Sequence, residues 1–179
     1  MMSARFALKA ETDAAHERLD QRMARLNLSD RADYSTFLAV HGAVLPGLEK
    51  QLEAGGLGAV VPLWLAHKRA GPLALDLAAM GIVPPEPVAV PAFASPEAML
   101  GAAYVLEGSR LGGQLLAKQV PDNFPTAFLR DQGNIAPWRE LVAALDGLLT
   151  SPGKLSQAKA AALDVFDAYS DAASRNGLD

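Results

Sequence analysis

Cysteine is absent from this chain of 179 residues. Its absence excludes disulfides, thiolate-ligated zinc, iron–sulfur clusters and thiol nucleophiles, so a bound metal requires histidine, carboxylate or a cofactor. An excess of positive charge is lacking too, because 16 basic residues stand against 20 acidic ones, for a formal net charge of -4. This balance offers no broad positive field to nucleic acid or to an anionic membrane.

Long apolar runs are also missing. The first residues interleave Arg5, Lys9 and Glu11 with single apolar residues, unlike the core of a signal peptide. No run approaches the roughly 20 residues that span a bilayer, and the chain ends on polar residues. We therefore expect a soluble, cytoplasmic protein with one domain over residues 1–179, either a monomer or a weak dimer.

Aromatic residues are few, at 6%, and no segment alternates apolar and polar residues as a half-buried strand would. The three-and-four spacing of apolar residues instead predicts an all-α protein. The predicted helices cover residues 3–28, 30–54, two short segments within 57–80 separated at Gly71-Pro72, and then 95–119, 137–149 and 156–173. Five prolines between residues 84 and 96 predict an extended connector.

Tyr104 to Gln114 is the most informative segment, because it places three glycines inside a predicted helix. Gly108, Gly112 and Gly113 should each cost about 1 kcal/mol relative to alanine. Gly108 and Gly112 are four residues apart and share one helix face. Two explanations are open: close packing against another helix, or close approach of a flat ligand to bare backbone.

His16 lies on the stripe of the first predicted helix that also carries Thr12. A lone histidine there is either a satisfied core residue or a metal ligand, and an imidazole opposite a glycine face is a geometry that could hold haem. Asp20, one turn later, is either the acceptor that orients the imidazole or a solvated surface charge. His41 and His67 lack a metal-site spacing, so we expect His41 in the core and His67 at the surface.

Two separated blocks resemble the haem (heme) oxygenase family, in particular its bacterial members. The first block is residues 8–20, with a lysine, a threonine and a histidine at the family's offsets, and the second is residues 104–114, with Leu-Glu-Gly-Ser-x-Leu-Gly-Gly. Weaker similarity follows in order at residues 34–52, 75–77 and Phe166. The resemblance covers most of the chain, from about residue 8 to residue 169.

The resemblance implies a single-domain helical bundle that holds haem between a proximal helix and a kinked distal helix. His16 would be the metal ligand, and Lys9, Thr12 and Phe166 would help to bind haem. On the distal side, the expected catalytic residues are Gly108, Ser109 and Gly112, and Gly113 would line the same face. Arg139 is a candidate partner for a propionate, although Lys9 and Arg139 are also compatible with ordinary solvated charges.

The reaction that the resemblance implies is the oxidative opening of haem by O2 to biliverdin, CO and ferrous iron, with haem as cofactor and substrate. Electrons would come from outside, because the sequence has no dinucleotide-binding glycine loop and no cysteine ligands. A ferredoxin, a flavodoxin or a reductase is the expected donor. Acidic donors of this kind could dock on a basic patch that includes Arg5, Lys9 and Arg18.

Ser109 departs from the animal enzymes, which carry an aspartate after the first distal glycine. A hydroxyl organises water less strongly than a carboxylate, so the distal water network is in question. The alternative function is therefore a haem-binding carrier or sensor that does not turn haem over. A second alternative is a protein of the same fold without haem, in which the glycines serve packing only.

Overall fold

The computed structural model describes residues 2–130 and 134–179, and all regular elements in these ranges are helical. This confirms the all-α prediction. The elements are α1 (Ala4–Met23), α2 (Arg31–Ala54), α3 (Leu57–Val60), the 3-10 helix η1 (Pro62–His67), α4 (Ala70–Ala79), α5 (Pro96–Ala117), α6 (Ala136–Leu148) and α7 (Pro152–Arg175).

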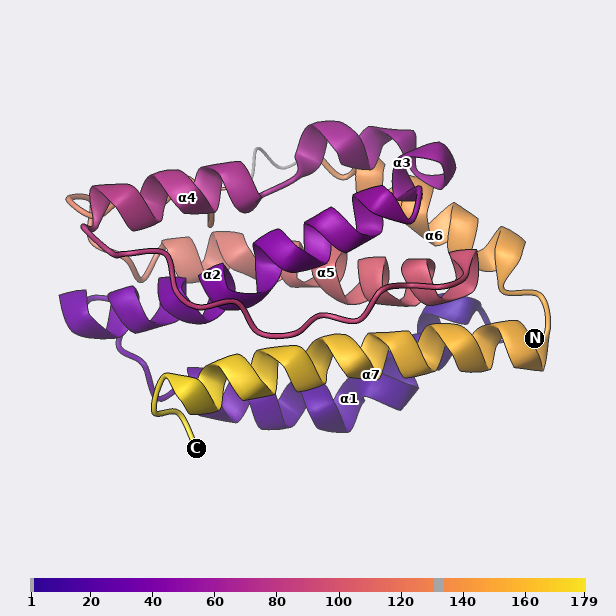
Figure 1. The fold of residues 1–179 in the computed structure, drawn as a ribbon, viewed down its shortest axis with the longest axis horizontal. Helices are drawn as coiled ribbons and strands as arrows, with labels where there is room; N and C mark the ends of the chain where they lie inside the picture. Colours follow the sequence, from indigo (N-terminus) through magenta and orange to yellow (C-terminus); the bar gives the residue numbers. More distant parts are fainter. Residues whose placement is uncertain (1, 131–133) are drawn as a thin grey trace.

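The long helices are arranged around α7, which packs against α5, α1 and α2 (Figure 1). α4 lies on the other side of α2. The core between them is built mainly from fully buried leucines and two large aromatic residues, Tyr34 and Trp64. Burial of this apolar surface is the dominant favourable term in folding.

The proline-rich connector after α4 has no regular structure and crosses the molecule beside α2, as Figure 1 shows. Val88 holds it there, since its side chain is buried and its backbone N–H donates to the Ala43 carbonyl at 3.0 Å. Gly42 makes room for it, because a Cβ at this position would lie 3.1 Å from Pro85. The connector is thus part of the fold rather than a linker between domains.

Two helices begin at cap residues that the sequence predicts. The side chains of Asp30 and Ser95 each accept a hydrogen bond from the first turn of the helix that follows. The predicted start of α7 at residue 156 is wrong, because Ser151 caps the helix and Pro152 occupies its first position, where proline is tolerated.

Two other predicted boundaries are wrong. Gly71-Pro72 does not separate the short helices, since both residues lie in the first turn of α4, where a missing N–H costs nothing. The chain instead leaves helical geometry at Lys68, which has an extended backbone. α1 ends at Met23, five residues before the predicted end.

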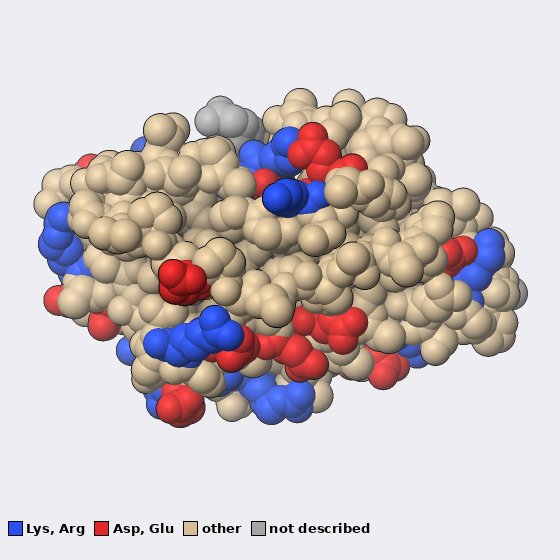
Figure 2. Space-filling model, in the orientation of Figure 1, with Lys and Arg blue, Asp and Glu red and all other residues tan. Residues whose placement is uncertain are grey.

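Charged side chains of both signs are interspersed on the face seen in Figure 2, which has a broad uncharged area between them. This distribution agrees with the absence of a basic run in the sequence. Among the described residues, the helices are too short or too polar to cross a membrane.

Candidate functional site

His16 projects from α1 into an exposed position, because 60% of its side chain is accessible. It is therefore not a satisfied core histidine. Its Nε2 lies 3.3 Å from Asp20 Oδ2, and its ring centroid lies 5.9 Å from that of Phe166 on α7. The imidazole has a carboxylate beside it, an aromatic ring behind it and free space in which to accept a ligand.

Lys9 and Thr12 lie on the same side of α1 as His16, and the three residues are called the His16 face below. Lys9 is exposed and forms an ion pair with Asp13 at 2.8 Å, which raises the pKa of Lys9. Thr12 is buried, and its hydroxyl donates to the Leu8 carbonyl at 2.9 Å. Thr12 therefore shapes the floor of this face, whereas Lys9 and His16 can reach a ligand.

The glycines of α5 divide into two classes when the space around each is compared. At Gly101, an added Cβ would lie 1.9 Å from the Ala158 carbonyl oxygen, so this glycine serves close packing of α5 on α7. A Cβ added at Gly112 would meet no atom of the described residues within 4 Å, and one added at Gly108 would meet only the Trp138 ring, at 3.9 Å. Packing within the described part of the chain explains Gly101 but not Gly108 or Gly112.

Exposed leucines flank the open glycines. Leu111 is 55% exposed and Leu115 is 66% exposed, an unusual condition for large apolar side chains on the same helix side. Gly108, Leu111, Gly112 and Leu115 together form the surface called the glycine face below. It combines bare backbone with accessible apolar groups, which suits a flat apolar ligand.

The His16 face and the glycine face belong to helices that both pack on α7 but hardly touch each other. They approach at Tyr104 of α5. Burial raises the pKa of Tyr104, while the positive charges of Lys9 and Arg5 on α1 act in the opposite direction. Trp138 of α6 completes this end, with its ring centroid 6.0 Å from that of Tyr104. A phenol and two cations therefore gather at one end of the two faces.

Three further residues of the predicted site take different positions. Phe166 is buried beside His16, where an apolar pocket residue is expected. Gly113 is turned away from the glycine face, because a Cβ there would lie 3.3 Å from the Leu129 carbonyl oxygen. Arg139 is exposed on the first turn of α6, next to Trp138.

A set of buried polar residues behind α5 was not predicted from the sequence. Arg69 is only 7% exposed, and its Nη2 donates to the Ser109 hydroxyl and to the Leu106 carbonyl, both at 2.9 Å. The Arg69 guanidinium also lies 5.2 Å from the centre of the Phe128 ring. Ser109 thus points towards Arg69, and its hydroxyl in turn donates to Leu106 O at 2.7 Å.

His41 lies next to Arg69 and is packed between aromatic rings, with centroids 4.8 Å away in Phe128 and 5.4 Å away in Tyr169. Burial, together with the Arg69 charge, lowers the pKa of His41 to about 3, so this histidine is neutral. Burial raises the pKa of Tyr169 to about 12. Within the described ranges, His41 Nδ1 and Arg69 Nε find no hydrogen-bond partner.

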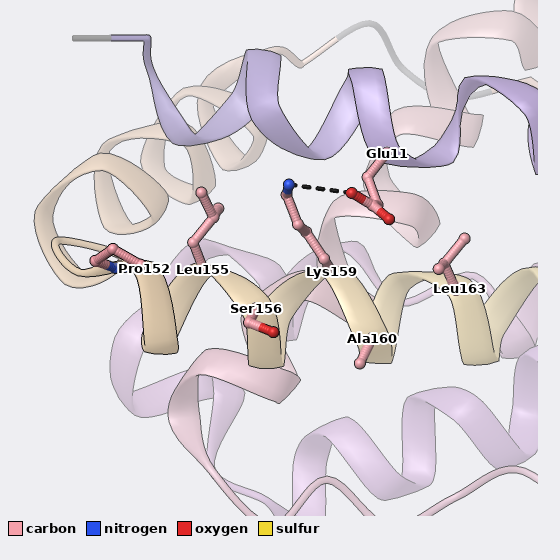
Figure 3. A pocket seen from close by; sticks show the side chains of 7 residues that line it. All are labelled: Glu11, Pro152, Leu155, Ser156, Lys159, Ala160 and Leu163. Carbon is pink, nitrogen blue, oxygen red and sulfur yellow. Dashed lines mark ion pairs between the residues drawn. The ribbon is translucent and has the colours of Figure 1, made fainter.

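One surface hollow lies along α7 and another lies beside α5. The larger, of about 440 Å³, is a groove between α1 and α7 that the Lys159–Glu11 ion pair bridges at 3.0 Å (Figure 3). Its lining does not include His16 or the glycine face. The smaller, of about 230 Å³, adjoins the glycine face through Leu111 and reaches Trp138.

The chemistry of the residues on the two faces fits haem. An accessible imidazole can ligate iron, bare backbone and leucines can lie against the porphyrin, and Lys9 with Tyr104 can bind carboxylates. A dedicated multi-residue metal cluster is not found among residues 2–130 and 134–179, and a haem iron with one histidine ligand does not need one. Tyr104 and Trp138 could be recognised only in three dimensions.

The comparisons with known proteins agree with this geometry. No family model matches the chain. A heme oxygenase from Xanthomonas campestris pv. campestris (strain 8004) is 33% identical over 144 residues, which cover 76% of this chain and 86% of that protein.

Solved structures show a similar fold. The heme oxygenase of Neisseria meningitidis, solved with NO and CO bound, superimposes with a TM-score of 0.85 at 21% identity, covering 100% of this chain and 94% of that one. The heme oxygenase of Leptospira interrogans gives a TM-score of 0.77 at 20% identity, covering 97% of this chain and 100% of that one. With the all-α fold, the two faces and a relative that aligns over most of its length, the chain belongs to the haem oxygenase family.

Proposed function

We propose that this chain binds haem between the His16 face of α1 and the glycine face of α5, and that it opens the bound haem to biliverdin, CO and ferrous iron with O2 and externally supplied electrons. The observation that carries the proposal is the space at Gly112, where an added Cβ would meet no atom of the described residues within 4 Å, and at Gly108, where it would meet only the Trp138 ring at 3.9 Å. Two glycines in a helix cost about 2 kcal/mol relative to alanine, and close packing among the described residues does not require a glycine at either position.

The residues of α1 would bind and orient haem. His16 would coordinate the iron through a neutral ring nitrogen, and Asp20 can accept a hydrogen bond from the imidazole, which fixes the orientation of the ring. In the structure, Nε2 is the ring nitrogen that faces Asp20. If Nε2 coordinates the iron, the hydrogen bond to Asp20 would have to come from Nδ1 instead. Lys9 and Tyr104 would hold the propionates at the end where the two helices approach.

The residues of α5 would control access to the other side of haem. When bound, haem supplies the iron that binds O2 and the porphyrin carbon that is oxidised. Gly108 and Gly112 present no side chain, so α5 can approach the porphyrin closely, and Leu111 and Leu115 exclude water from its edge. Ser109 would serve catalysis through its position beside Gly108, because its hydroxyl is already engaged with Arg69 and Leu106.

Electrons would come from a ferredoxin, flavodoxin or reductase. Arg5 and Lys9 lie on α1 at the end marked by Tyr104, and Arg18 is exposed further along the same helix. We propose these cations as the docking patch for an acidic donor. Arg18→Glu should slow turnover driven by a ferredoxin and its reductase but leave turnover driven by ascorbate unchanged. If the ferredoxin-driven rate of Arg18→Glu equals that of the wild type, Arg18 is not part of the patch.

The experiment that tests the proposed function is a visible spectrum of the purified protein with one equivalent of hemin, followed by ascorbate in air. We expect a Soret band that decays while a broad red absorption of biliverdin grows. A Soret band that persists under reductant and O2 would instead indicate a carrier or sensor. No change in the hemin spectrum on mixing would contradict haem binding altogether.

A further inference from the structure

The turn of α5 around Gly108 is held by four charged residues, called the polar clasp below, of which three are buried and Arg110 is partly buried. They are Glu49 from α2, Arg69 from the start of α4, and Glu107 and Arg110 from α5. Exposed fractions are 4% for Glu49, 7% for Arg69 and 3% for the Glu107 side chain, and 10% of the Arg110 side chain is accessible. Charges this deeply buried are retained only when they are paired and hydrogen-bonded.

Glu49 anchors the backbone from which Arg69 projects. Its two carboxylate oxygens accept hydrogen bonds from the backbone N–H of Arg69 at 2.6 Å and of Ala70 at 3.0 Å. The pKa of Glu49 is raised by burial, and these two N–H donors together with the nearby arginines act against that rise. The start of α4 is therefore held to α2 by a bidentate contact rather than by apolar packing alone.

From this anchored position the clasp holds α5 at two adjacent points. Arg69 Nη2 donates to Leu106 O and to Ser109 Oγ, both at 2.9 Å. Arg110 donates to the His67 carbonyl and to Glu107 at 3.0 Å. The contacts reach α5 at residues 106–110, on both sides of Gly108.

We propose that Arg69 is a positioning residue for the haem site, which acts through Ser109 and Leu106 to fix the turn of α5 that presents Gly108 and Gly112 to haem. This inference rests on the proposed function. It follows from where the restraint lies: Gly101 packs closely on Ala158 of α7, whereas a Cβ added at Gly112 would meet no atom of the described residues within 4 Å. The Arg69 contacts reach α5 between these two positions.

The same chain contains a matched control. Arg22 of α1 also donates through Nη2 to a serine hydroxyl and a carbonyl, at 2.7 Å to Ser174 Oγ and 3.1 Å to Ser170 O. It ties the end of α1 to the C-terminal end of α7. Arg22→Met therefore removes the same kind of contact without touching α5.

The test compares Arg69→Met, Ser109→Ala and the double variant with Arg22→Met, first by amide hydrogen exchange of the protein without hemin. Because a hydrogen bond to a charged group contributes on the order of tenfold or more to a local equilibrium, we expect about tenfold faster exchange of amides 106–116 in the first two variants. The double variant should exchange no faster than Arg69→Met, since Arg69→Met already removes the Arg69–Ser109 hydrogen bond that Ser109→Ala removes. Arg22→Met should leave these amides unchanged.

The second readout is the pattern of hyperfine-shifted haem methyl resonances in the proton NMR spectrum of each ferric hemin complex. This pattern reports how haem is seated, and a general loss of stability does not move it. We expect it to change in Arg69→Met and Ser109→Ala but not in Arg22→Met. If Arg69→Met does not fold, Ser109→Ala tests the same contact from the α5 side.

Unchanged exchange at residues 106–116 together with a wild-type methyl pattern in Ser109→Ala would overturn the positioning role. A uniform rise in exchange over the whole protein, with an unchanged methyl pattern, would also overturn it, since Arg69 would then be a general stabiliser. Failure of the wild-type protein to bind hemin would refute the proposed function instead. The exchange measurement, made without hemin, keeps these outcomes distinct.

Discussion

Replacing Gly112 by alanine should stabilise the protein and weaken haem binding at the same time. A methyl group at this position meets no atom of residues 2–130 and 134–179 within 4 Å, so the substitution adds no clash with these residues. Alanine is favoured over glycine in a helix by up to about 1 kcal/mol, because glycine loses more backbone entropy on folding. For a protein of this size, 1 kcal/mol corresponds to a rise in Tm of roughly 2–4 °C.

The cost should appear when hemin is added. In the proposed complex, a methyl group on the glycine face would occupy the space that the porphyrin needs, and overpacking of this kind costs about 1–3 kcal/mol. That range corresponds to a roughly 5- to 150-fold loss of hemin affinity. Thermal unfolding of the protein without hemin and hemin titration followed at the Soret band measure the two effects separately.

Two other glycines serve as controls. A Cβ added at Gly147 of α6 would likewise meet no atom within 4 Å in the part of the chain that the structure describes, so Gly147→Ala should not lower Tm and should leave hemin affinity unchanged. Gly101→Ala should lower stability strongly, because its methyl would lie 1.9 Å from the Ala158 carbonyl oxygen. If Gly112→Ala binds hemin as tightly as Gly147→Ala does, the glycine face is not the haem surface and the reasoning fails.

Three further predictions concern charge. His41→Phe should make the free energy of unfolding less sensitive to acid. Because the pKa of His41 is lowered to about 3 in the folded protein, the wild type loses stability as pH falls below about 6.5, by on the order of 2 kcal/mol at pH 4.5. The same pH dependence of urea unfolding in the wild type and in His41→Phe would contradict this. Asp76→Ala should cost about 2–4 kcal/mol in urea unfolding, since two main-chain amides, the buried one of Phe128 and the partly buried one of Ala127, lose their acceptor. Lys9→Ala should weaken hemin binding a few-fold, whereas Asp13→Ala, which frees Lys9, should not.

Most of the fold could be predicted from the sequence because its signals are local. Helix caps at Asp30 and Ser95 are predicted from residue type, whereas the cap at Ser151 was missed. Gly71-Pro72 misled the prediction, since proline breaks a helix only beyond its first turn. Whether a proline lies in the first turn depends on where the helix begins, and tertiary contacts to Glu49 decide that here.

The candidate site was predictable only in part. His16, Gly108 and Gly112 stand in blocks that resemble the family, but spacing alone could not separate a packing glycine from an open one. The structure separates Gly101 from Gly112 because the atoms opposite them come from distant parts of the chain. The role of Arg69 could not be predicted from the sequence, because a single arginine before a helix is common and its buried partners are known only from the structure.

The central claim is that His16 ligates haem iron on the exposed face of α1. The most direct measurement is the ferric and ferrous absorption spectrum of hemin bound to wild-type protein and to His16→Ala, with and without added imidazole. We predict a sharp Soret band in the wild type, its loss or a marked shift in His16→Ala, and its recovery when imidazole fills the space of the missing side chain. Identical spectra of wild type and His16→Ala would contradict the account.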